Sequence, residues 1–250
     1  MIPKIPTTLR GSILLCLVGF FSIASAAVIQ IEVLDDTYIR SDSGGPDSKN
    51  DGDSDNEIIV GRNGAAGVAL LNGLARFDLS DILALGPAAN LQINSVTLTG
   101  ITRAGDTGQG SNVTLTLYEY GFEFIEAHAT WNDPDGDGAI GTGDITPGGT
   151  LGTLLSSVLV ADPIPSGQSI IYADSPAFRS AVAGQLAGDG TLNLLLTGTG
   201  DNTQSFVRFD DEDRANPLLL AVDVTVIPEM GSVTLFGLSA LLLAARRSRA

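Results

Sequence analysis

Acidic side chains recur at close intervals in residues 133–144, which read Asp-Pro-Asp-Gly-Asp-Gly-Ala-Ile-Gly-Thr-Gly-Asp. They occupy positions 1, 3, 5 and 12 of this stretch, with glycine at position 6, as in a twelve-residue calcium loop. Carboxylates at alternate positions can aim at one ion, and the glycine allows the sharp turn around it. The spacing predicts a structural Ca²⁺ ion held by Asp133, Asp135, Asp137, Asp144 and the backbone carbonyl of Ala139.

The surroundings of this loop define its expected role. Its last acidic residue is aspartate rather than glutamate, and the sequence predicts no amphipathic helix on either side. A bound ion would therefore stiffen a loop between strands rather than move a pair of helices. A solvated acidic turn is the alternative interpretation.

A second acidic stretch covers residues 47–57. Asp51, Asp53 and Asp55 repeat the first three acidic positions, but Asn56 stands where the loop needs glycine. A second ion site is one interpretation of this stretch, and a solvated loop is the favoured one.

Three aromatic residues offer a different kind of chemistry. Trp131 is the only tryptophan, and with Tyr118 and Tyr120 it could stack on a sugar ring. A lone tryptophan that follows a strand more often fills the edge of a core, and that interpretation is favoured here.

Catalysis is not expected from the residue types present. His128 is the single histidine and has only Glu126 nearby in sequence; no Gly-x-Ser-x-Gly motif occurs. Arg76 and Arg208 lie between apolar residues of expected strands. We expect them to form partly buried ion pairs with aspartates that connect the sheets.

Apolar and polar residues alternate through most of the chain, which is typical of strands buried on one face. Strands are expected at residues 28–33, 37–40, 57–61, 70–78, 92–102, 112–120, 154–160, 169–172, 191–197, 204–209 and 218–226. The Gly-rich residues 105–110 predict that the strands on either side of them pair with each other. One helix is expected at 176–186, capped by Ser175. The pattern predicts an all-β, jelly-roll-like antiparallel β-sandwich; a parallel β-helix is the rival, but no repeat supports it.

The N-terminal residues 1–26 have the layout of a signal peptide. Lys4 and Arg10 precede the apolar run 13–23, and a small-x-small site ends at Ala26. Cleavage is expected after Ala26 or Ala27, which removes Cys16, the only cysteine. The domain at 27–226 would then depend on its core, and on any bound ions, without a disulfide.

The C-terminal residues 227–250 combine three parts: a short Pro-Glu motif, an apolar run at 232–245 and a basic end. This tail resembles the PEP-CTERM sorting signal of Gram-negative bacteria. Pro228 and Glu229 match its motif, Met230 replaces the second proline, and Arg246 and Arg247 begin the basic end. The resemblance implies a short transmembrane helix, processing by an exosortase-type enzyme, and a place at the cell surface or in an exopolysaccharide matrix.

Five short segments follow one another in order along residues 28–226. They read Asp-Thr-Tyr-Ile-Arg-Ser at 36–41, Leu-Ala-Arg-Phe-Asp-Leu-Ser at 74–80, Ile-Asn-Ser-Val-Thr-Leu at 93–98, Ala-Thr-Trp-Asn at 129–132 and Phe-Asp-Asp-Glu-Asp-Arg-Ala-Asn-Pro-Leu at 209–218. Together they resemble the DNRLRE domain family of exported bacterial β-sandwich proteins. Some relatives of that family are carbohydrate-binding modules of polysaccharide-degrading enzymes, and the 209–218 segment here is unusually acidic.

Net charge limits the partners of this domain. Residues 27–227 hold 28 acidic against 8 basic side chains, which leaves a net charge of −20. Nucleic acid and anionic lipid are therefore poor partners for this domain, because binding either one needs a basic face. The favoured hypothesis is an exported, non-catalytic surface or matrix protein stabilised by calcium. The alternatives are a carbohydrate-binding module for an extracellular polysaccharide and, less favoured, a polysaccharide-active enzyme.

Overall fold

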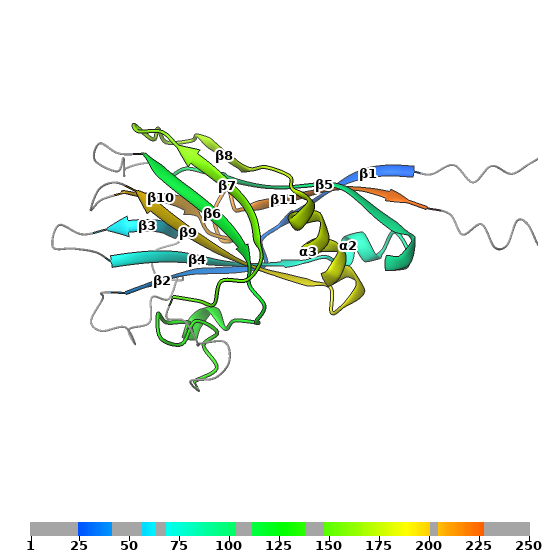
Figure 1. The fold of residues 1–250 in the computed structure, drawn as a ribbon, viewed down its shortest axis with the longest axis horizontal. Helices are drawn as coiled ribbons and strands as arrows, with labels where there is room; N and C mark the ends of the chain where they lie inside the picture. Colours follow the sequence, from blue (N-terminus) through cyan, green and yellow to red (C-terminus); the bar gives the residue numbers. More distant parts are fainter. Residues whose placement is uncertain are drawn as a thin grey trace, which may run out of the picture. The chain divides into compact units, whose positions relative to one another are not determined.

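The alternating segments form eleven strands in the computed structural model, which describes residues 25–41, 57–63, 69–103, 112–138, 148–200 and 205–227. These residues belong to one unit of the chain, 24–227 (Figure 1). The strands are β1 (Ser25–Glu32), β2 (Asp35–Arg40), β3 (Glu57–Asn63), β4 (Ala69–Asp78), β5 (Leu91–Ile101), β6 (Val113–Glu119), β7 (Leu154–Val160), β8 (Ser169–Tyr172), β9 (Thr191–Gly200), β10 (Ser205–Asp210) and β11 (Leu219–Val226).

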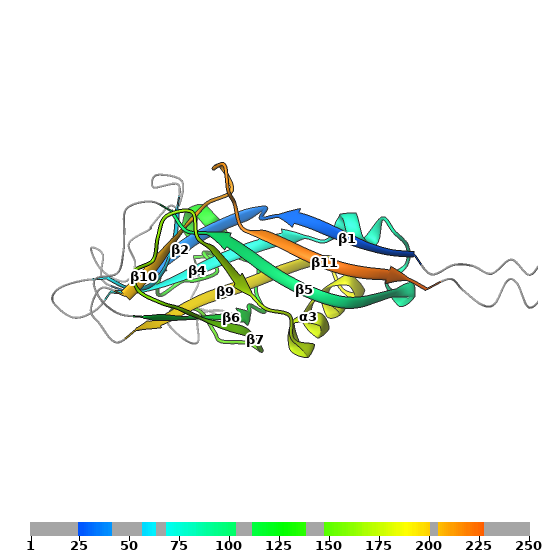
Figure 2. The same cartoon turned by 90° about the horizontal axis from the view of Figure 1, so that it is seen from above.

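The first sheet has four strands in the order β1-β11-β5-β8, all antiparallel. The last strand, β11, lies inside it, with β1 on one side and β5 on the other (Figure 2). Ser25 pairs with Val226, so the first and last described strands begin and end side by side. The expected signal-peptidase site overlaps the start of β1, because cleavage after Ala26 leaves this strand from residue 27 onward.

The second sheet has seven strands. Six of them follow the order β10-β3-β4-β9-β6-β7, and the seventh, β2, pairs with β4. Strand β3 pairs with β10 over residues 57–62 and with β4 over residues 61–63, so its pairing with β4 begins at Gly61, whose φ is +130°. A Cβ atom on Gly198 of β9 would lie 2.7 Å from the Gly61 Cα atom. Glycine at both positions therefore lets β3 and β9 approach closely.

The main hydrophobic core lies between the two sheets, and helix α3 (Pro176–Ala187) contributes to it. The Ser175 Oγ atom accepts a hydrogen bond from the Phe178 N–H at 3.0 Å, which satisfies one of the free donors of the first turn. The helix buries Phe178, Ala181, Val182 and Leu186. This confirms the expected helix, its cap and its proline start. A short helix α2 (Ser80–Leu83) and two 3₁₀ turns, η1 (Ala88–Asn90) and η2 (Glu126–His128), were not predicted.

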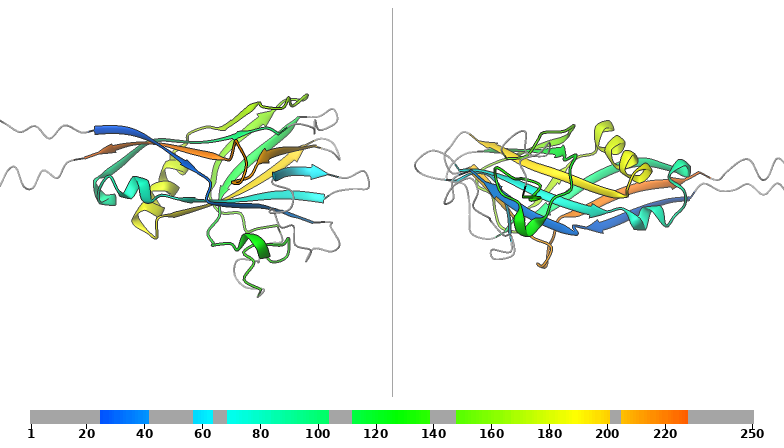
Figure 3. Two further views of the ribbon diagram at one scale, coloured as in Figure 1. Left: turned by 180° about the vertical axis from the view of Figure 1, so that it is seen from behind. Right: turned by 90° about the horizontal axis from the view of Figure 1, so that it is seen from below.

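A second, smaller hydrophobic cluster covers the opposite face of the seven-stranded sheet. Leu195 of β9 belongs to it, whereas its neighbours Leu194 and Leu196 face the main core. Residues 120–131 supply the other side of this cluster. Its members are Ile39, Leu74, Tyr120, Phe124, Ala129, Trp131 and Leu195. Figure 3 shows the ribbon of the segment that leads into the predicted calcium loop, drawn in green, beside the strands of this sheet. Apolar side chains attach this segment to the sheet.

The structure confirms an all-β, two-sheet antiparallel architecture and corrects one pairing. The strands on either side of residues 105–110 do not pair: β5 lies in the four-stranded sheet and β6 in the seven-stranded one. A short Gly-rich connection is compatible with a hairpin, but here the chain changes sheets between the two strands. None of the helices in the described ranges is long and apolar enough to cross a bilayer. The expected leader, apart from its last residues, and the tail with Pro228, Glu229, Arg246 and Arg247 lie outside those ranges.

Candidate functional site

Trp131 fixes one end of the predicted calcium loop. Only 9% of its surface is exposed, and its ring packs against the backbone of Gly148 (φ +87°). A Cβ atom at position 148 would lie 2.6 Å from the Trp131 Cη2 atom, so only glycine fits without rearrangement. The Gly148 N–H also donates to the Trp131 carbonyl at 2.7 Å, and Asn72 of β4 donates to the Gly148 carbonyl at 2.6 Å. The two ends of residues 131–148 are therefore held together on the sheet.

Backbone hydrogen bonds hold the first part of the loop on η2. The Ile125 N–H donates to the Asp135 carbonyl at 2.8 Å, and the Thr130 N–H donates to the Asp133 carbonyl at 2.8 Å. Gly136 (φ +70°) rests on this turn, since a Cβ atom there would lie 2.8 Å from the Ala129 nitrogen. The loop therefore has a defined conformation up to Gly138.

Three carboxylates converge at this loop. One ligand oxygen from each of Asp133, Asp135 and Asp137 lies within 4.8 Å of the others; among the described residues, no other group of three acidic, histidine or cysteine side chains is this close. The Gly138 N–H donates to Asp133 Oδ2 at 3.1 Å, whereas Asp133 Oδ1 is buried without a hydrogen-bond partner. An oxygen-only, converging set with a buried acceptor fits a hard cation such as Ca²⁺. The other predicted ligands, Ala139 and Asp144, lie outside the described residues, as do Asp51, Asp53 and Asp55.

Arg76 connects this region to the sheet. Its Nη1 atom lies 3.0 Å from Asp35 Oδ2 on β2, and Nε donates to Asn193 Oδ1 on β9 at 3.3 Å. Its Nη2 atom donates to the Phe124 carbonyl, and the guanidinium lies 4.8 Å from the centre of the Phe124 ring. One arginine thus joins three neighbouring strands to the segment that precedes the loop.

Both arginines form ion pairs as predicted, but Arg208 pairs with a glutamate instead of an aspartate, and neither pair connects the two sheets. Arg76 pairs with an aspartate, but that residue lies in the same sheet. Arg208 pairs at 3.0 Å with Glu57 of β3, again within the seven-stranded sheet. The pair that does link the two sheets is Arg103 with Glu57, at 2.9 Å, because Arg103 follows β5. Alternation along a strand locates a charge on a face but not its partner.

A buried acidic cluster was not anticipated from the sequence. Asp36 of β2 is 1% exposed, and it lies beside Asp211 and Glu212 of the turn that follows β10. Burial, followed by the neighbouring Glu212 carboxylate, raises the pKa of Asp36 to about 10, with smaller contributions from Asp211 and Glu126. The carboxyl of Asp36 therefore keeps its proton at neutral pH. Burial also raises the pKa of Asp211 and of Glu212.

The residues considered for sugar binding or catalysis are placed as follows. Tyr120 is 1% exposed and, like Trp131, packs in the second cluster, so neither offers an open ring face. Tyr118 of β6 is partly exposed beside that cluster. His128 is exposed on η2, and Glu126 is partly exposed there. The placement of Trp131 agrees with its interpretation as a core residue.

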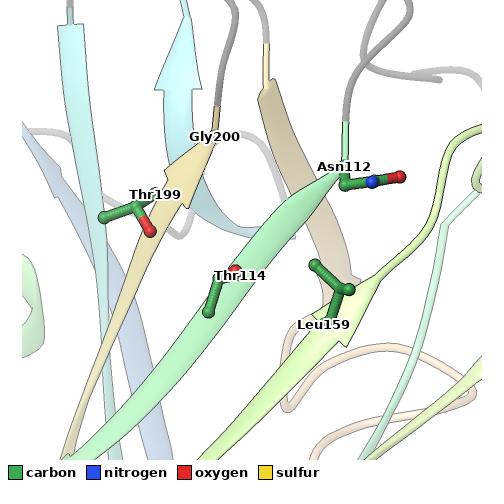
Figure 4. A pocket seen from close by; sticks show the side chains of 5 residues that line it. All are labelled: Asn112, Thr114, Leu159, Thr199 and Gly200. Carbon is green, nitrogen blue, oxygen red and sulfur yellow. The ribbon is translucent and has the colours of Figure 1, made fainter.

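A shallow hollow of about 200 Å³ lies elsewhere, where β6 begins and β7 and β9 end (Figure 4). No acid, base or aromatic ring lines it, so it lacks the groups needed for general acid–base catalysis or sugar stacking. Its lining residues are Asn112, Thr114, Leu159, Thr199 and Gly200.

Comparisons with known proteins give little further guidance. No protein-family model matches the sequence, and no curated protein matches it. One solved structure that resembles the chain is that of a candidate glycoside hydrolase from Bacteroides vulgatus, with 12% sequence identity and a TM-score of 0.20. The match covers 69% of this chain and 72% of that one. At this TM-score the likeness has no bearing on function.

Proposed function

We propose that this chain is an exported, non-catalytic protein of the cell surface or extracellular matrix, with a jelly-roll-like sandwich stabilised by calcium. The observation that carries the calcium part is the convergence of Asp133, Asp135 and Asp137 within 4.8 Å on an anchored loop. The domain's net charge also favours cations over anionic polymers as partners.

Calcium would act through the attachment of this loop to the sheet. The three aspartates would hold the ion, and the sequence spacing adds the Ala139 carbonyl and Asp144. The same segment supplies Phe124 and Trp131 to the second hydrophobic cluster. An ion that fixes the loop therefore also keeps apolar side chains on the outer face of the sheet out of water.

The proposed location rests on the ends of the chain. A signal peptide at 1–26 would direct export, and a PEP-CTERM-like tail at 227–250 would deliver the protein to an exosortase-type enzyme. Because such tails accompany exopolysaccharide production, exopolysaccharide is the proposed neighbour of the folded domain. The DNRLRE resemblance is compatible with this role.

Thermal unfolding tests the role of calcium. With a dissociation constant of about 10⁻⁴ M, 10 mM Ca²⁺ would stabilise the domain by about 2.7 kcal/mol relative to EDTA. We expect this gain to shrink in the double variant Asp133→Asn/Asp135→Asn and to persist in Asp81→Asn, which changes an exposed aspartate on α2. An identical gain in the double variant and in the wild type would rule out the loop as a calcium site.

A carbohydrate-binding role is the second candidate, and the partly exposed ring of Tyr118 favours it. We expect binding on an array of neutral glycans that is lost in Tyr118→Ala while the melting temperature is kept. Absence of binding to every neutral and anionic glycan on the array would eliminate this candidate.

A further inference from the structure

Strand β7 has one edge with which no described strand pairs. It ends the order of the seven-stranded sheet, and its only strand partner among the described residues is β6. The Ser175 Oγ atom donates to the Leu155 carbonyl and so covers the start of the other edge. Beyond that point, alternate residues of an antiparallel strand turn their N–H and C=O groups away from the partner strand. Within the described part of the chain, residues 156–160 thus form an open edge.

The open edge lacks the charges that keep edge strands apart. Residues 145–161 contain no charged side chain, and no proline interrupts β7. The other edge strands of six residues or more each carry charge: β1 ends with Glu32, β2 contains Arg40, and β10 contains Arg208. Charged residues on an edge strand block its pairing with another chain. Strand β7 is therefore the long edge at which this fold permits such pairing.

Exposed apolar side chains gather on the same side of the sandwich. Leu159 of β7 is 63% exposed and lies on the outer face beside Thr114 (Figure 4). Leu154, at the start of the strand, is 53% exposed. Strand β8, an edge of the other sheet, lies next to β7 (Figure 1) and exposes 51% of Ile171. These side chains would add apolar contact area to any strand that pairs with the open edge.

We propose that the open edge pairs with the open edge of a second copy of this chain, in an antiparallel, two-fold dimer. A two-fold axis sets the same surface of both copies against itself, so a charge on the edge would face a like charge. An edge without charge satisfies this condition. An acidic domain that recruited a different protein by charge would present acidic residues at the contact, and β7 has none. The pairing would join two seven-stranded sheets into one continuous sheet.

Sedimentation velocity of the purified protein in EDTA tests the dimer. EDTA keeps calcium from bridging acidic surfaces, so the result does not depend on the loop site. We expect a dimer with a dissociation constant below about 100 μM. This constant should fall as NaCl is added, because salt screens the repulsion between two acidic copies. A contact built on ion pairs would weaken instead.

A pair of leucine variants tests the position of the contact. Leu159→Glu places a charge at the open edge and should raise the dissociation constant at least about tenfold. Leu85→Glu is the matched control, because it changes an exposed leucine that follows α2 and should leave the dissociation constant nearly unchanged.

Hydrogen exchange on the wild type locates the contact on the backbone, whether or not the variants fold. Amides of residues 156–160 should exchange more slowly at concentrations at which the dimer dominates, because pairing provides acceptors for their N–H groups. A wild type that stays monomeric up to about 100 μM would overturn the inference. It would fall equally with a dimer that resists Leu159→Glu, that both variants dissociate alike, or that leaves exchange at 156–160 unchanged.

Discussion

Replacing Asp36 with asparagine should remove a large part of the pH dependence of stability in the cation-free protein. Asp36 is buried beside Glu212, Asp211 and Glu126, and this environment favours the neutral carboxyl. Asparagine has the same shape and stays neutral at every pH. The wild type and the variant should therefore diverge as the pH rises.

The size of this divergence follows from the pKa of Asp36. Its ordinary value is 3.8, and burial raises it to about 10 in the folded chain. Between these values the folded state binds one more proton than the unfolded state, so the free energy of unfolding falls by about 1.4 kcal/mol per pH unit. The stabilisation from protonated Asp36 is fully present below the pKa of this residue in the unfolded chain. It is lost as the pH rises towards and through the pKa of Asp36 in the folded chain. From pH 5 to pH 8 the loss from this group is about 4 kcal/mol.

Urea unfolding in EDTA at pH 5, 6, 7 and 8 measures this effect. The free energy of unfolding of an ordinary domain is about 5–15 kcal/mol, so a change of about 4 kcal/mol clearly shifts the urea concentration at the midpoint of unfolding. Asp81→Asn is the control, since it removes an exposed aspartate and should follow the wild-type curve. If the wild-type and Asp36→Asn curves stay parallel, within about 1 kcal/mol, Asp36 is not a buried acid and the reasoning is refuted.

The remaining predictions concern packing and charge. Glu57→Gln removes the charge of a side chain that is 6% exposed and pairs with two arginines. Urea unfolding should show that the free energy of unfolding falls by about 3 kcal/mol. A decrease below about 0.5 kcal/mol would contradict this prediction. Gly198→Ala should lower the free energy of unfolding by about 1–3 kcal/mol, because the added Cβ atom would meet the Gly61 backbone. Gly184→Ala should raise it by about 0.5–1 kcal/mol, because a Cβ atom there meets open space in α3. Equal effects of the two variants on the free energy of unfolding would refute this contrast. Trp131→Ala should cost about 3–5 kcal/mol, and a melting temperature equal to wild type would show that the ring is not part of the core.

Local patterns predicted the elements of this fold better than their partners. Short apolar and alternating segments located the described strands, and Ser175 with Pro176 located α3, because these signals depend on neighbours in sequence. The pairing of β5 and β6 was predicted wrongly because a Gly-rich connection does not reveal whether the next strand stays in the same sheet. The second hydrophobic cluster was also hidden, since Leu195 belongs to an unbroken apolar run whose two faces look alike in sequence.

The two acidic sites show the same limit. Asp133, Asp135 and Asp137 are close in sequence, so their convergence was predicted from spacing, and the structure brings them together. Asp36 of β2 and Asp211, which follows β10, come together only through pairing of strands that are far apart in sequence. The acidic run after β10 was visible, and an aspartate at the start of an apolar strand was a further signal, but nothing local connects the two.

The position of β11 has a mechanical consequence. Strand β11 has eight register pairs with β1 and eight with β5, so neighbouring strands pair with it along both edges. If the tail is the tether, a force between it and the body of the domain runs along β11 and loads both ladders in shear, where many hydrogen bonds must break together. A force that separates the two ends of the processed domain would instead peel β1 from β11 one pair at a time, starting at Ala27 and Val224. Pairing along both edges of β11 would therefore resist a pull applied to the C-terminal end of this strand.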